Sequence, residues 1–443
     1  MLNKVLTING GQPLKGTVKV RGAKNLVPKA MVASLLGDGV SVLRNVPEIK
    51  DVEVVTGLLN IHGVTVDKDS VTGDLTLNPA GAKTAPSTEI DAYAGDSRIP
   101  ILLCGPLMHT IGEAFIPDLG GCRIGDRPID YHLNVLRKFG AVVDKAPNGI
   151  TISARNGLYG AKLELPYPSV GATEQVLLTG VKAKGTTELK NAALEPEILD
   201  LISILQKMGA IIHVRSERTI VIEGVDKLRG YDHTALPDRN EGASCASAAL
   251  ATGGDILVQG ADQQDLASFL NTYRKLGGDF DVKGDGIRFY HPGGDLNPLV
   301  VETDVHPGFM TDWQQPLVVA LTQAQGVSIV HETVYENRFG FTDALVRMGA
   351  TVQLHRDCLG SLPCRFDNRD FLHSAVITGK SELHGADFVI PDLRGGFSHV
   401  IAALTAKGTS NASGIELINR GYEHFLEKLQ GLGADVELRE AAL

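Results

Sequence analysis

The sequence lacks the features that mark membrane-inserted, secreted or disulfide-rich proteins. No segment approaches the roughly 18 consecutive apolar residues that identify a membrane-spanning helix, and the N-terminal MLNKVLTINGG has no apolar signal core. The five cysteines are odd in number and scattered over 443 residues, which favours reduced thiols over a disulfide framework. Together these absences predict a cytoplasmic protein that does not insert into a membrane.

Clustered basic charge and the common cofactor motifs are also missing. A net charge of −10 argues against a general nucleic-acid binder, so any anionic ligand must be bound by a local group of cations. The sequence contains no H-E-x-x-H, no P-loop and no strand-to-helix G-x-G-x-x-G, so no nucleotide triphosphate or dinucleotide cofactor is indicated. Cys358 and Cys364 have no companion His or Cys at the spacing of a zinc site, and we interpret the pair as a loop feature.

The strongest signal that is present is an internal repeat. Six times an apolar, helix-like segment ends at a glycine turn, and a short β-type run follows. The turns are at Gly39, Gly112, Gly185, Gly254, Gly326 and Gly408, and the runs include Val40–Leu43, Thr186–Leu189, Ile256–Gln259 and Val327–Val330. Successive turns are 73, 73, 69, 72 and 82 residues apart, and an insertion near Arg356–Leu372 lengthens the last interval.

A second helical segment follows in each unit and ends at a further glycine, directly before another strand. These glycines are Gly63, Gly140, Gly209, Gly277, Gly349 and Gly433. Each unit is therefore predicted as helix, strand, helix and strand, with further strand before the next unit, which is an α/β organisation. Six units suit two domains of three, joined near the Gly- and Pro-containing stretch Lys227–Asp238.

Charged or capping residues recur where these helices begin. They are Lys24, Arg98, Ser169, Asp238-Arg239, Asp312 and Arg394 at the first helices, and Arg127, Arg338 and Arg420 at the second helices. Helix N-termini bind anions through unpaired N–H groups and the helix dipole, and basic side chains reinforce this. If the helix starts of both domains face one cleft, that cleft gathers a cluster of cations. The alternatives are solvated surface side chains and, for Asp312, an ordinary acid in a first helical turn.

The stretch DLGGCRIGDRPIDYH, residues Asp118–His132, carries the candidate for covalent or acid–base chemistry. Cys122 stands between glycines, and Arg123 and Arg127 favour its thiolate. An ordinary thiol pKa of about 8.5 leaves most of such a side chain protonated at neutral pH, so the roles of nucleophile and proton donor both stay open. The competing interpretation is a buried, inert cysteine.

Nine motifs cover nearly the whole chain: GAKN at Gly22–Asn25, NVPEIKDV at Asn45–Val52, GGCRIGDRPID at Gly120–Asp130, PSVGATE at Pro168–Glu174, EPEI at Glu195–Ile198, HPGFMTDWQQP at His306–Pro316, ETVYENRF at Glu332–Phe339, DLRGG at Asp392–Gly396 and NRGYE at Asn419–Glu423. They resemble motifs of the UDP-N-acetylglucosamine 1-carboxyvinyltransferases, the enolpyruvyl transferase family that opens bacterial peptidoglycan synthesis. The resemblance implies a two-domain inside-out α/β barrel with three βαβαββ-type repeats per domain. Residues 23–236 form one implied domain with the Cys122 loop, residues 1–22 and 237–443 form the other, and the active site lies in the cleft between them.

The resemblance also implies transfer of enolpyruvate from phosphoenolpyruvate to the 3-hydroxyl of UDP-N-acetylglucosamine, with release of phosphate and without a metal or organic cofactor. It makes Cys122 the proton donor and covalent site, the residue that fosfomycin alkylates, and Asp312 the base near the sugar hydroxyl; Lys24 and Arg394 complete the catalytic set. Implied phosphoenolpyruvate-binding residues are Lys24, Asn25, Arg127, Arg394 and Arg420. Implied UDP-sugar-binding residues are Asn25, Arg98, Arg127, Pro128, Ile129, Asp130, Tyr131, Ser169, Val170, Gly171, Asp312 and Val334.

Two alternatives stay open. A 3-phosphoshikimate 1-carboxyvinyltransferase shares the fold and the donor, but it is expected to carry a GDKS-type motif in place of GAKN and to lack Cys122. A non-catalytic paralogue, retained for binding or regulation, is expected to have lost Lys24, Cys122 or Asp312. All three residues are present here.

Overall fold

The computed structural model describes residues 4–95, 97–119 and 129–440. The described chain divides into two compact units. We call residues 21–119 and 129–236 the N-terminal unit, and residues 4–20 and 237–440 the C-terminal unit. The second unit therefore includes the first strands of the chain. None of the helices in the described ranges combines the length and the apolar character needed to cross a membrane.

The N-terminal unit contains three sheets in its described residues, with strand orders β13-β3-β5-β4, β6-β8-β7 and β11-β12-β10-β9. Its strands are β3 (Ser41–Arg44), β4 (Thr65–Lys68), β5 (Leu75–Asn78), β6 (Glu113–Pro117), β7 (Val142–Ala146), β8 (Gly149–Ser153), β9 (Lys162–Glu164), β10 (Thr186–Lys190), β11 (Ile211–Arg215), β12 (Thr219–Glu223) and β13 (Asp232–Thr234). Its helices are α1 (Val27–Ala33), η1 (Ser34–Leu36), α2 (Lys50–Ile61), η2 (Pro79–Gly81), α3 (Ser87–Ile90), η3 (Asp91–Tyr93), η4 (Ile99–Leu103), α4 (Cys104–Thr110), α5 (Asp130–Lys138), α6 (Val170–Gly180) and α7 (Pro196–Lys207).

The described C-terminal unit also contains three sheets, ordered β21-β22-β1-β23, β15-β16-β14-β2 and β17-β18-β20-β19. Its strands are β1 (Lys4–Asn9), β2 (Lys15–Lys19), β14 (Asp255–Gln259), β15 (Asp279–Lys283), β16 (Gly286–Tyr290), β17 (Val300–Glu302), β18 (Gly326–His331), β19 (Thr351–His355), β20 (Ser374–Gly379), β21 (Asp387–Val389), β22 (Thr409–Ser413) and β23 (Asp435–Glu440). Its helices are α8 (Arg239–Ala251), α9 (Ala267–Leu276), α10 (Thr311–Leu321), α11 (Thr342–Arg347), α12 (Leu393–Thr405), η5 (Ile415–Arg420) and α13 (Phe425–Gly431).

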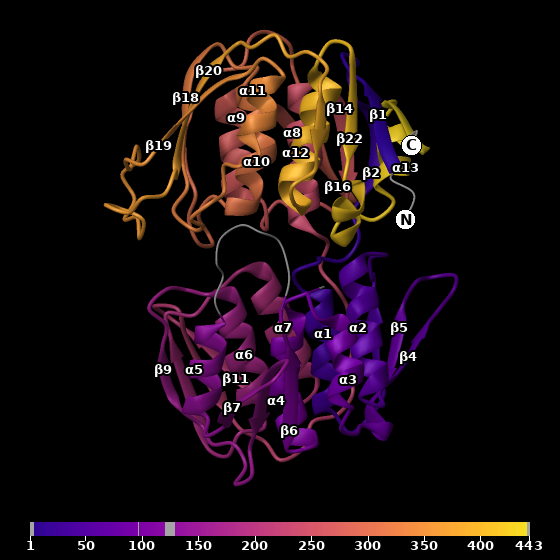
Figure 1. Cartoon of the computed structure of the whole chain (residues 1–443), viewed down its shortest axis with the longest axis vertical. Helices are drawn as coiled ribbons and strands as arrows, with labels where there is room; N and C mark the ends of the chain where they lie inside the picture. Colours follow the sequence, from indigo (N-terminus) through magenta and orange to yellow (C-terminus); the bar gives the residue numbers. More distant parts are fainter. Residues whose placement is uncertain (1–3, 96, 120–128, 441–443) are drawn as a thin grey trace. The chain divides into compact units, whose positions relative to one another are not determined.

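Buried helices form the centre of the C-terminal unit. α8 packs against both α10 and α12, and Figure 1 shows these helices side by side with strands on either side of them. Every residue of α8 is buried, because its sequence RNEGASCASAALA is rich in small side chains that allow neighbouring helices to approach closely. Helices therefore lie inside and sheets outside, which confirms the predicted inside-out α/β fold. The sheets of the described residues remain separate, so none of them closes into a barrel.

The predicted repeat is confirmed by the backbone. All six glycines that were expected to end a second helix have positive φ, a conformation that favours glycine because it has no Cβ. They are Gly63 (81°), Gly140 (97°), Gly209 (107°), Gly277 (108°), Gly349 (100°) and Gly433 (83°). The predicted β-type runs are also confirmed, since they coincide with most of β3, β10, β14 and β18.

Two regions depart from an exact repeat. Five of the described sheets contain one parallel strand pair, whereas β6, β7 and β8 are purely antiparallel, and the chain before α4 forms the short helices α3, η3 and η4. The second departure is the loop between β19 and β20, residues 356–373, which contains no helix or strand. This loop matches the insertion predicted near Arg356–Leu372.

Candidate active site

The C-terminal unit holds Asp312 between two arginines. Asp312 lies in the first turn of α10, where its negative charge complements the helix dipole. Its Oδ1 accepts a hydrogen bond from Arg338 Nη2 at 2.5 Å, and its Oδ2 lies 3.4 Å from Arg394 Nε. The two arginine side chains are only 1% and 6% exposed, whereas that of Asp312 is 20% exposed. The structure thus brings two cations that the sequence placed at different helix starts onto one carboxylate.

The start of α12 positions Arg394. Asp392 is the N-cap residue, and its Oδ1 accepts hydrogen bonds from the backbone N–H groups of Arg394 and Gly395 at 2.9 and 3.0 Å. Arg394 Nη1 donates to the Tyr422 hydroxyl at 3.0 Å, and that hydroxyl lies 2.9 Å from Ser244 Oγ. Two nitrogens of the Arg394 guanidinium, Nε and Nη1, therefore contact other side chains of the protein before any ligand binds.

Electrostatics keep these arginines charged although they are buried. Burial opposes the charge of Arg394, but Tyr422 and Asp312 outweigh it and raise the pKa of the guanidinium above its ordinary value. Burial likewise opposes the charge of Arg338, and the nearby carboxylates, Asp312 first, raise its pKa. Burial raises the pKa of Tyr422, so its hydroxyl stays neutral beside Arg394. The arrangement is a fixed pair of buried cations, with Arg394 in the first turn of α12 and Arg338 in the segment before α11.

Val334 lies next to a buried carboxylate of the same unit. Glu332 Oε1 accepts a hydrogen bond from the Val334 N–H at 2.8 Å, and Glu332 Oε2 accepts one from Thr311 Oγ1 at 2.8 Å. The segment that carries Val334 is thereby attached to the residue before Asp312. Arg420 is the last residue of η5 and is half-buried.

The N-terminal unit presents Lys24 differently. Its Nζ lies 2.7 Å from Asp51 Oδ2, and the two side chains are 19% and 4% exposed. Asp51 belongs to the first turn of α2. The next residue, Asn25, accepts a hydrogen bond on its backbone carbonyl from Lys29 Nζ at 2.8 Å. The GAKN motif is therefore attached to α1 and α2 through two lysines.

Several predicted UDP-sugar residues gather at the starts of α5 and α6, which pack against each other. Ser169 is the N-cap of α6, and its Oγ accepts from the Ala172 N–H at 3.3 Å. A Cβ added at Gly171 would lie 2.9 Å from His132 Nε2, so glycine allows the two helices to approach here. The residues that the two starts bring together are Ile129, Asp130, Tyr131, Ser169, Val170 and Gly171, while Arg98 is the N-cap residue of η4.

Three predicted site residues, Cys122, Arg127 and Pro128, lie outside the described residues. Tyr422, the partner of Arg394, and Ser244, the partner of Tyr422, were missed. The only sequence signal for Tyr422 was its place in the NRGYE motif, and Ser244 gave none. The prediction that Arg338 and Arg420 begin second helices is wrong, because Arg338 lies outside a helix before α11 and Arg420 ends η5 before α13. The partner of Arg338, Asp312, is 26 positions away and could not be deduced from spacing.

The interpretation of Cys358 and Cys364 as a loop feature without companions is wrong. In the described residues His331 and His373 join them, and one possible ligand atom from each of the four side chains lies within 4.8 Å of the others. The sequence spacing hid this cluster because its members come from one strand and a long loop.

Comparison with known proteins gives consistent matches over nearly the whole chain. A profile of the EPSP synthase (3-phosphoshikimate 1-carboxyvinyltransferase) family matches residues 8–429. The UDP-N-acetylglucosamine 1-carboxyvinyltransferase of Protochlamydia amoebophila is 48% identical, with 98% of this chain and 94% of that protein covered. The enzyme of the same name from Chlamydia abortus is 44% identical, with 97% of each chain covered.

Solved structures agree on the fold. The enolpyruvyl transferase NikO from Streptomyces tendae superposes with a TM-score of 0.86 at 22% identity and full coverage of both chains. The EPSP synthase of Acinetobacter baumannii superposes with a TM-score of 0.74 at 18% identity, over 98% of this chain and 100% of that one. At these identities the likeness speaks for the fold alone.

Proposed function

The chain belongs to the EPSP synthase family, and we propose that it transfers enolpyruvate from phosphoenolpyruvate to the 3-hydroxyl of UDP-N-acetylglucosamine, releasing phosphate. We propose this acceptor because the relatives named for this activity are up to 48% identical to the chain over nearly its full length. The observation that carries the proposal is the buried Arg394, held between Asp312 and Tyr422. It joins a fixed cation at the start of α12 to an acid at the start of α10.

The proposed chemistry is an addition followed by an elimination. A proton adds to the methylene carbon of phosphoenolpyruvate, C2 becomes electron-deficient, and the sugar 3-oxygen bonds to C2 while its own proton passes to a base. The intermediate then loses phosphate from C2 and a proton from the methyl carbon, which restores the double bond. The enzyme must therefore supply one acid, one base and cations for a phosphate and a carboxylate.

We assign the base to Asp312 and the anion contacts to Arg394, Lys24, Asn25, Arg127 and Arg420. Arg394 is suited to this because a buried guanidinium offers a planar, directed set of N–H donors to phosphate or carboxylate. Asp312 Oδ2 faces Arg394. An anion bound by Arg394 would therefore lie next to the Asp312 carboxylate, which is the proposed base for the sugar proton. Lys24 adds a second cation, on the GAKN motif.

We assign proton donation to Cys122, on the strength of its motif. The UDP-sugar contacts that we propose are the starts of α5 and α6 with Arg98, Asn25, Arg127, Pro128, Asp312 and Val334. Backbone N–H groups at helix starts are ordinary binding groups for a diphosphate, which supports this assignment for Ile129–Tyr131 and Ser169–Gly171. We further propose that the reaction is cytoplasmic and is the first committed step of peptidoglycan synthesis.

The test is phosphate release from phosphoenolpyruvate by the purified protein. UDP-N-acetylglucosamine is supplied in one reaction and shikimate 3-phosphate in another. Release with the UDP-sugar alone is expected. Release with shikimate 3-phosphate alone would replace the proposed acceptor, and release with neither would favour the non-catalytic paralogue.

The role of Cys122 has its own measurement. Fosfomycin, an epoxide that mimics a phosphate, is expected to alkylate Cys122 and to abolish phosphate release. Cys122→Ser is expected to lose most turnover while it still binds UDP-N-acetylglucosamine in calorimetry. Full turnover of this variant would remove Cys122 from the mechanism, and Cys104→Ala, which changes a buried thiol of the N-terminal unit, is the control.

A further inference from the structure

The long loop between β19 and β20 brings two cysteines to two buried histidines. Cys358 and Cys364 lie in this loop, His373 ends it, and His331 is the last residue of β18. Strand pairing fixes the histidines, since His331 is opposite Ser374 in the antiparallel pair of β18 and β20. The rings of His331 and His373 lie with their centroids 5.4 Å apart.

His331 is oriented as a metal ligand would be. It is fully buried, and its Nδ1 lies 3.3 Å from Glu302 Oε2. Its Nε2 is also buried and has no hydrogen-bond partner among the described residues. A histidine that donates its Nδ1–H to a carboxylate directs the Nε2 lone pair to the other side, which is the usual arrangement behind zinc-bound imidazoles. An unpaired buried nitrogen is costly, and a bound cation would satisfy it.

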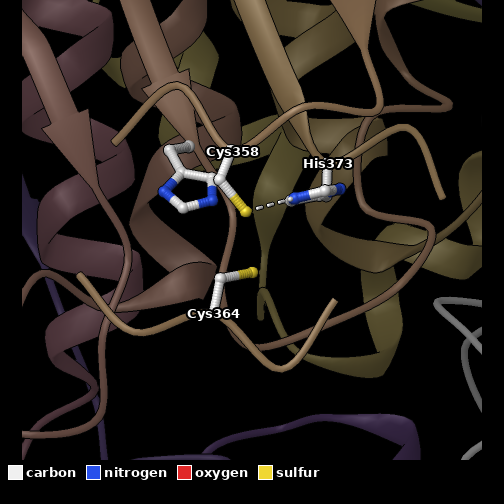
Figure 2. A group of neighbouring side chains, drawn as sticks. Cys358, Cys364 and His373 are labelled. Carbon is white, nitrogen blue, oxygen red and sulfur yellow. Dashed lines mark hydrogen bonds between the residues drawn. The ribbon is translucent and has the colours of Figure 1, made fainter. Parts of the chain in front are cut away.

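His373 is also oriented with its Nδ1 bound to an acceptor and its Nε2 available to a metal. Its Nδ1 donates a hydrogen bond to the Phe371 carbonyl at 2.9 Å, so that Nε2 carries the lone pair. Nε2 lies 3.3 Å from Cys358 Sγ, and Figure 2 shows this sulfur directed toward the His373 ring. Cys364 Sγ accepts the Phe366 backbone N–H at 3.4 Å, a contact that stabilises charge on sulfur.

From these contacts we propose that His331, Cys358, Cys364 and His373 form a structural Zn²⁺ site. A tetrahedral zinc with Zn–S of about 2.3 Å and Zn–N of about 2.0 Å separates its ligand atoms by about 3.3 to 3.8 Å. The Cys358–His373 pair is already at that separation, and the four atoms lie within 4.8 Å of one another, so only a small contraction is needed. Two thiolates and two imidazoles match the preference of zinc among common divalent metals.

Gly360 shows how closely the loop packs behind the site. A Cβ at this position would lie 2.1 Å from Glu302 Oε2 and 2.4 Å from His331 Nδ1. The Glu302 carboxylate also accepts the backbone N–H groups of Ser361 and Leu362 at 2.9 and 2.8 Å. The loop backbone therefore encloses the Glu302–His331 pair that orients the metal ligand.

The proposed role is structural, because four protein ligands leave no open position for a substrate. Residues 356–373 form no helix or strand, and a loop of that length is uncommon in a compact domain. Its own packing centres on the buried Phe366, whose ring contacts those of Phe371 and His373. Zinc would join the loop to the ends of β18 and β20, and its binding energy would become local folding energy. The inference does not depend on the proposed function, since metal content is measured without substrate.

The first test is the metal content of the protein purified without added metal or chelator. We expect about one zinc per chain in the wild type and in the control Cys104→Ala, and close to none in Cys358→Ser/Cys364→Ser. Should the double variant fail to fold, Cys364→Ser alone serves the same comparison. Removal of zinc by a chelator is expected to lower Tm by several degrees in the wild type and not in the cysteine variants.

Cobalt provides a second, independent readout. Co²⁺ added to the zinc-free wild type is expected to give the visible bands of tetrahedral coordination and a near-ultraviolet thiolate charge-transfer band. Gly360→Ala, which changes no ligand, is expected to weaken Co²⁺ binding at least about 10-fold, the usual cost of disturbing a group behind a ligand. Three results would overturn the proposal: a zinc-free wild type that gives no thiolate band, zinc retained by the double variant, or a Cys358–Cys364 disulfide in freshly purified protein.

Discussion

The two units hold their candidate anion-binding cations in different ways. In the C-terminal unit Arg338 and Arg394 are buried, and both contact Asp312. Arg394 also donates a hydrogen bond to Tyr422. In the N-terminal unit Lys24 pairs with Asp51 and keeps 19% of its side chain exposed. The contacts in the C-terminal unit fix the direction of the guanidinium N–H donors. The N-terminal unit provides a positive charge at the end of a flexible lysine side chain. If both residues bind anions as proposed, Arg394 is suited to orient its ligand and Lys24 to contribute charge alone.

The choice of side chain agrees with this division. A guanidinium is planar and offers five donors in a rigid fork, whereas an ammonium is a compact charge that rotates freely. Fixing a cation in a buried site is costly unless every donor finds a partner. Arg394 meets part of that requirement, because its Nε lies beside Asp312 and its Nη1 donates to Tyr422, which holds the guanidinium in one orientation. Arg338 meets it less fully, since its Nε is buried without a hydrogen-bond partner among the described residues.

Asp312→Asn is expected to have the largest effect. It removes the proposed base and leaves Arg338 and Arg394 without their shared carboxylate. Turnover should fall about 10²- to 10⁴-fold, and unfolding free energy by about 3 kcal/mol. Phosphate release and chemical denaturation measure the two losses separately. Asp343→Asn, at the exposed start of α11, is the matched control, and normal turnover of Asp312→Asn would exclude the base assignment.

Arg394→Lys tests whether direction matters in the C-terminal unit. A lysine keeps the charge but cannot contact Asp312 and Tyr422 together, so kcat/KM for phosphoenolpyruvate should fall about 100-fold. Arg347→Lys, at the exposed end of α11, is expected to be neutral. A loss below about threefold would mean that a positive charge alone is sufficient at position 394, without the planar fork of a guanidinium.

Lys24→Arg is the reciprocal exchange in the N-terminal unit. Because Lys24 is partly exposed, the larger guanidinium can keep its charge near the same place, and kcat/KM should fall by no more than about 10-fold. Lys24→Met, which removes the charge, should cost more. If Lys24→Arg proved as damaging as Arg394→Lys, the proposed difference between the two units would be wrong.

The smallest expected effect concerns a buried carboxylate in each unit. Burial raises the pKa of Glu174 to about 7, against the pull of Lys29 at 3.4 Å. Burial likewise raises that of Glu241 to about 7, against Lys428 at 2.6 Å. A raised folded-state pKa gives a stability contribution that is complete below the ordinary value of 4.5 and is lost as pH rises through about 7.

Glu174→Gln and Glu241→Gln should therefore remove part of the fall in Tm between about pH 5 and pH 8. Lys29 keeps the Asn25 carbonyl as a partner and Lys428 keeps Glu423, so neither substitution isolates its lysine. The exposed Glu53→Gln is the control. An unchanged Tm profile in both variants would show that these carboxylates do not titrate in this range.

The sequence alone was sufficient for the repeat and for the residues that begin first helices, such as Asp312 and Arg394, but not for Arg338 and Arg420. Glycine with positive φ, helix caps and short β-type runs are local signals, and six copies of them reinforce one another. The motif residues were therefore predicted as a set, and their roles in the candidate site stay predictions. The sequence did not predict which of these residues contact one another, because Asp312, Arg338 and Arg394 meet only after three segments of one domain pack together.

The sequence by itself thus determined the α/β class, the six units and the chemistry that the residues can offer. Only the tertiary structure decided which of them share a contact: the Arg394–Tyr422–Ser244 chain, and the cluster in which His331 and His373 join Cys358 and Cys364. The physical reason is that strand pairing joins residues far apart in the chain. His331 lies opposite Ser374 in the antiparallel pair of β18 and β20, a neighbour that no spacing rule in the sequence describes.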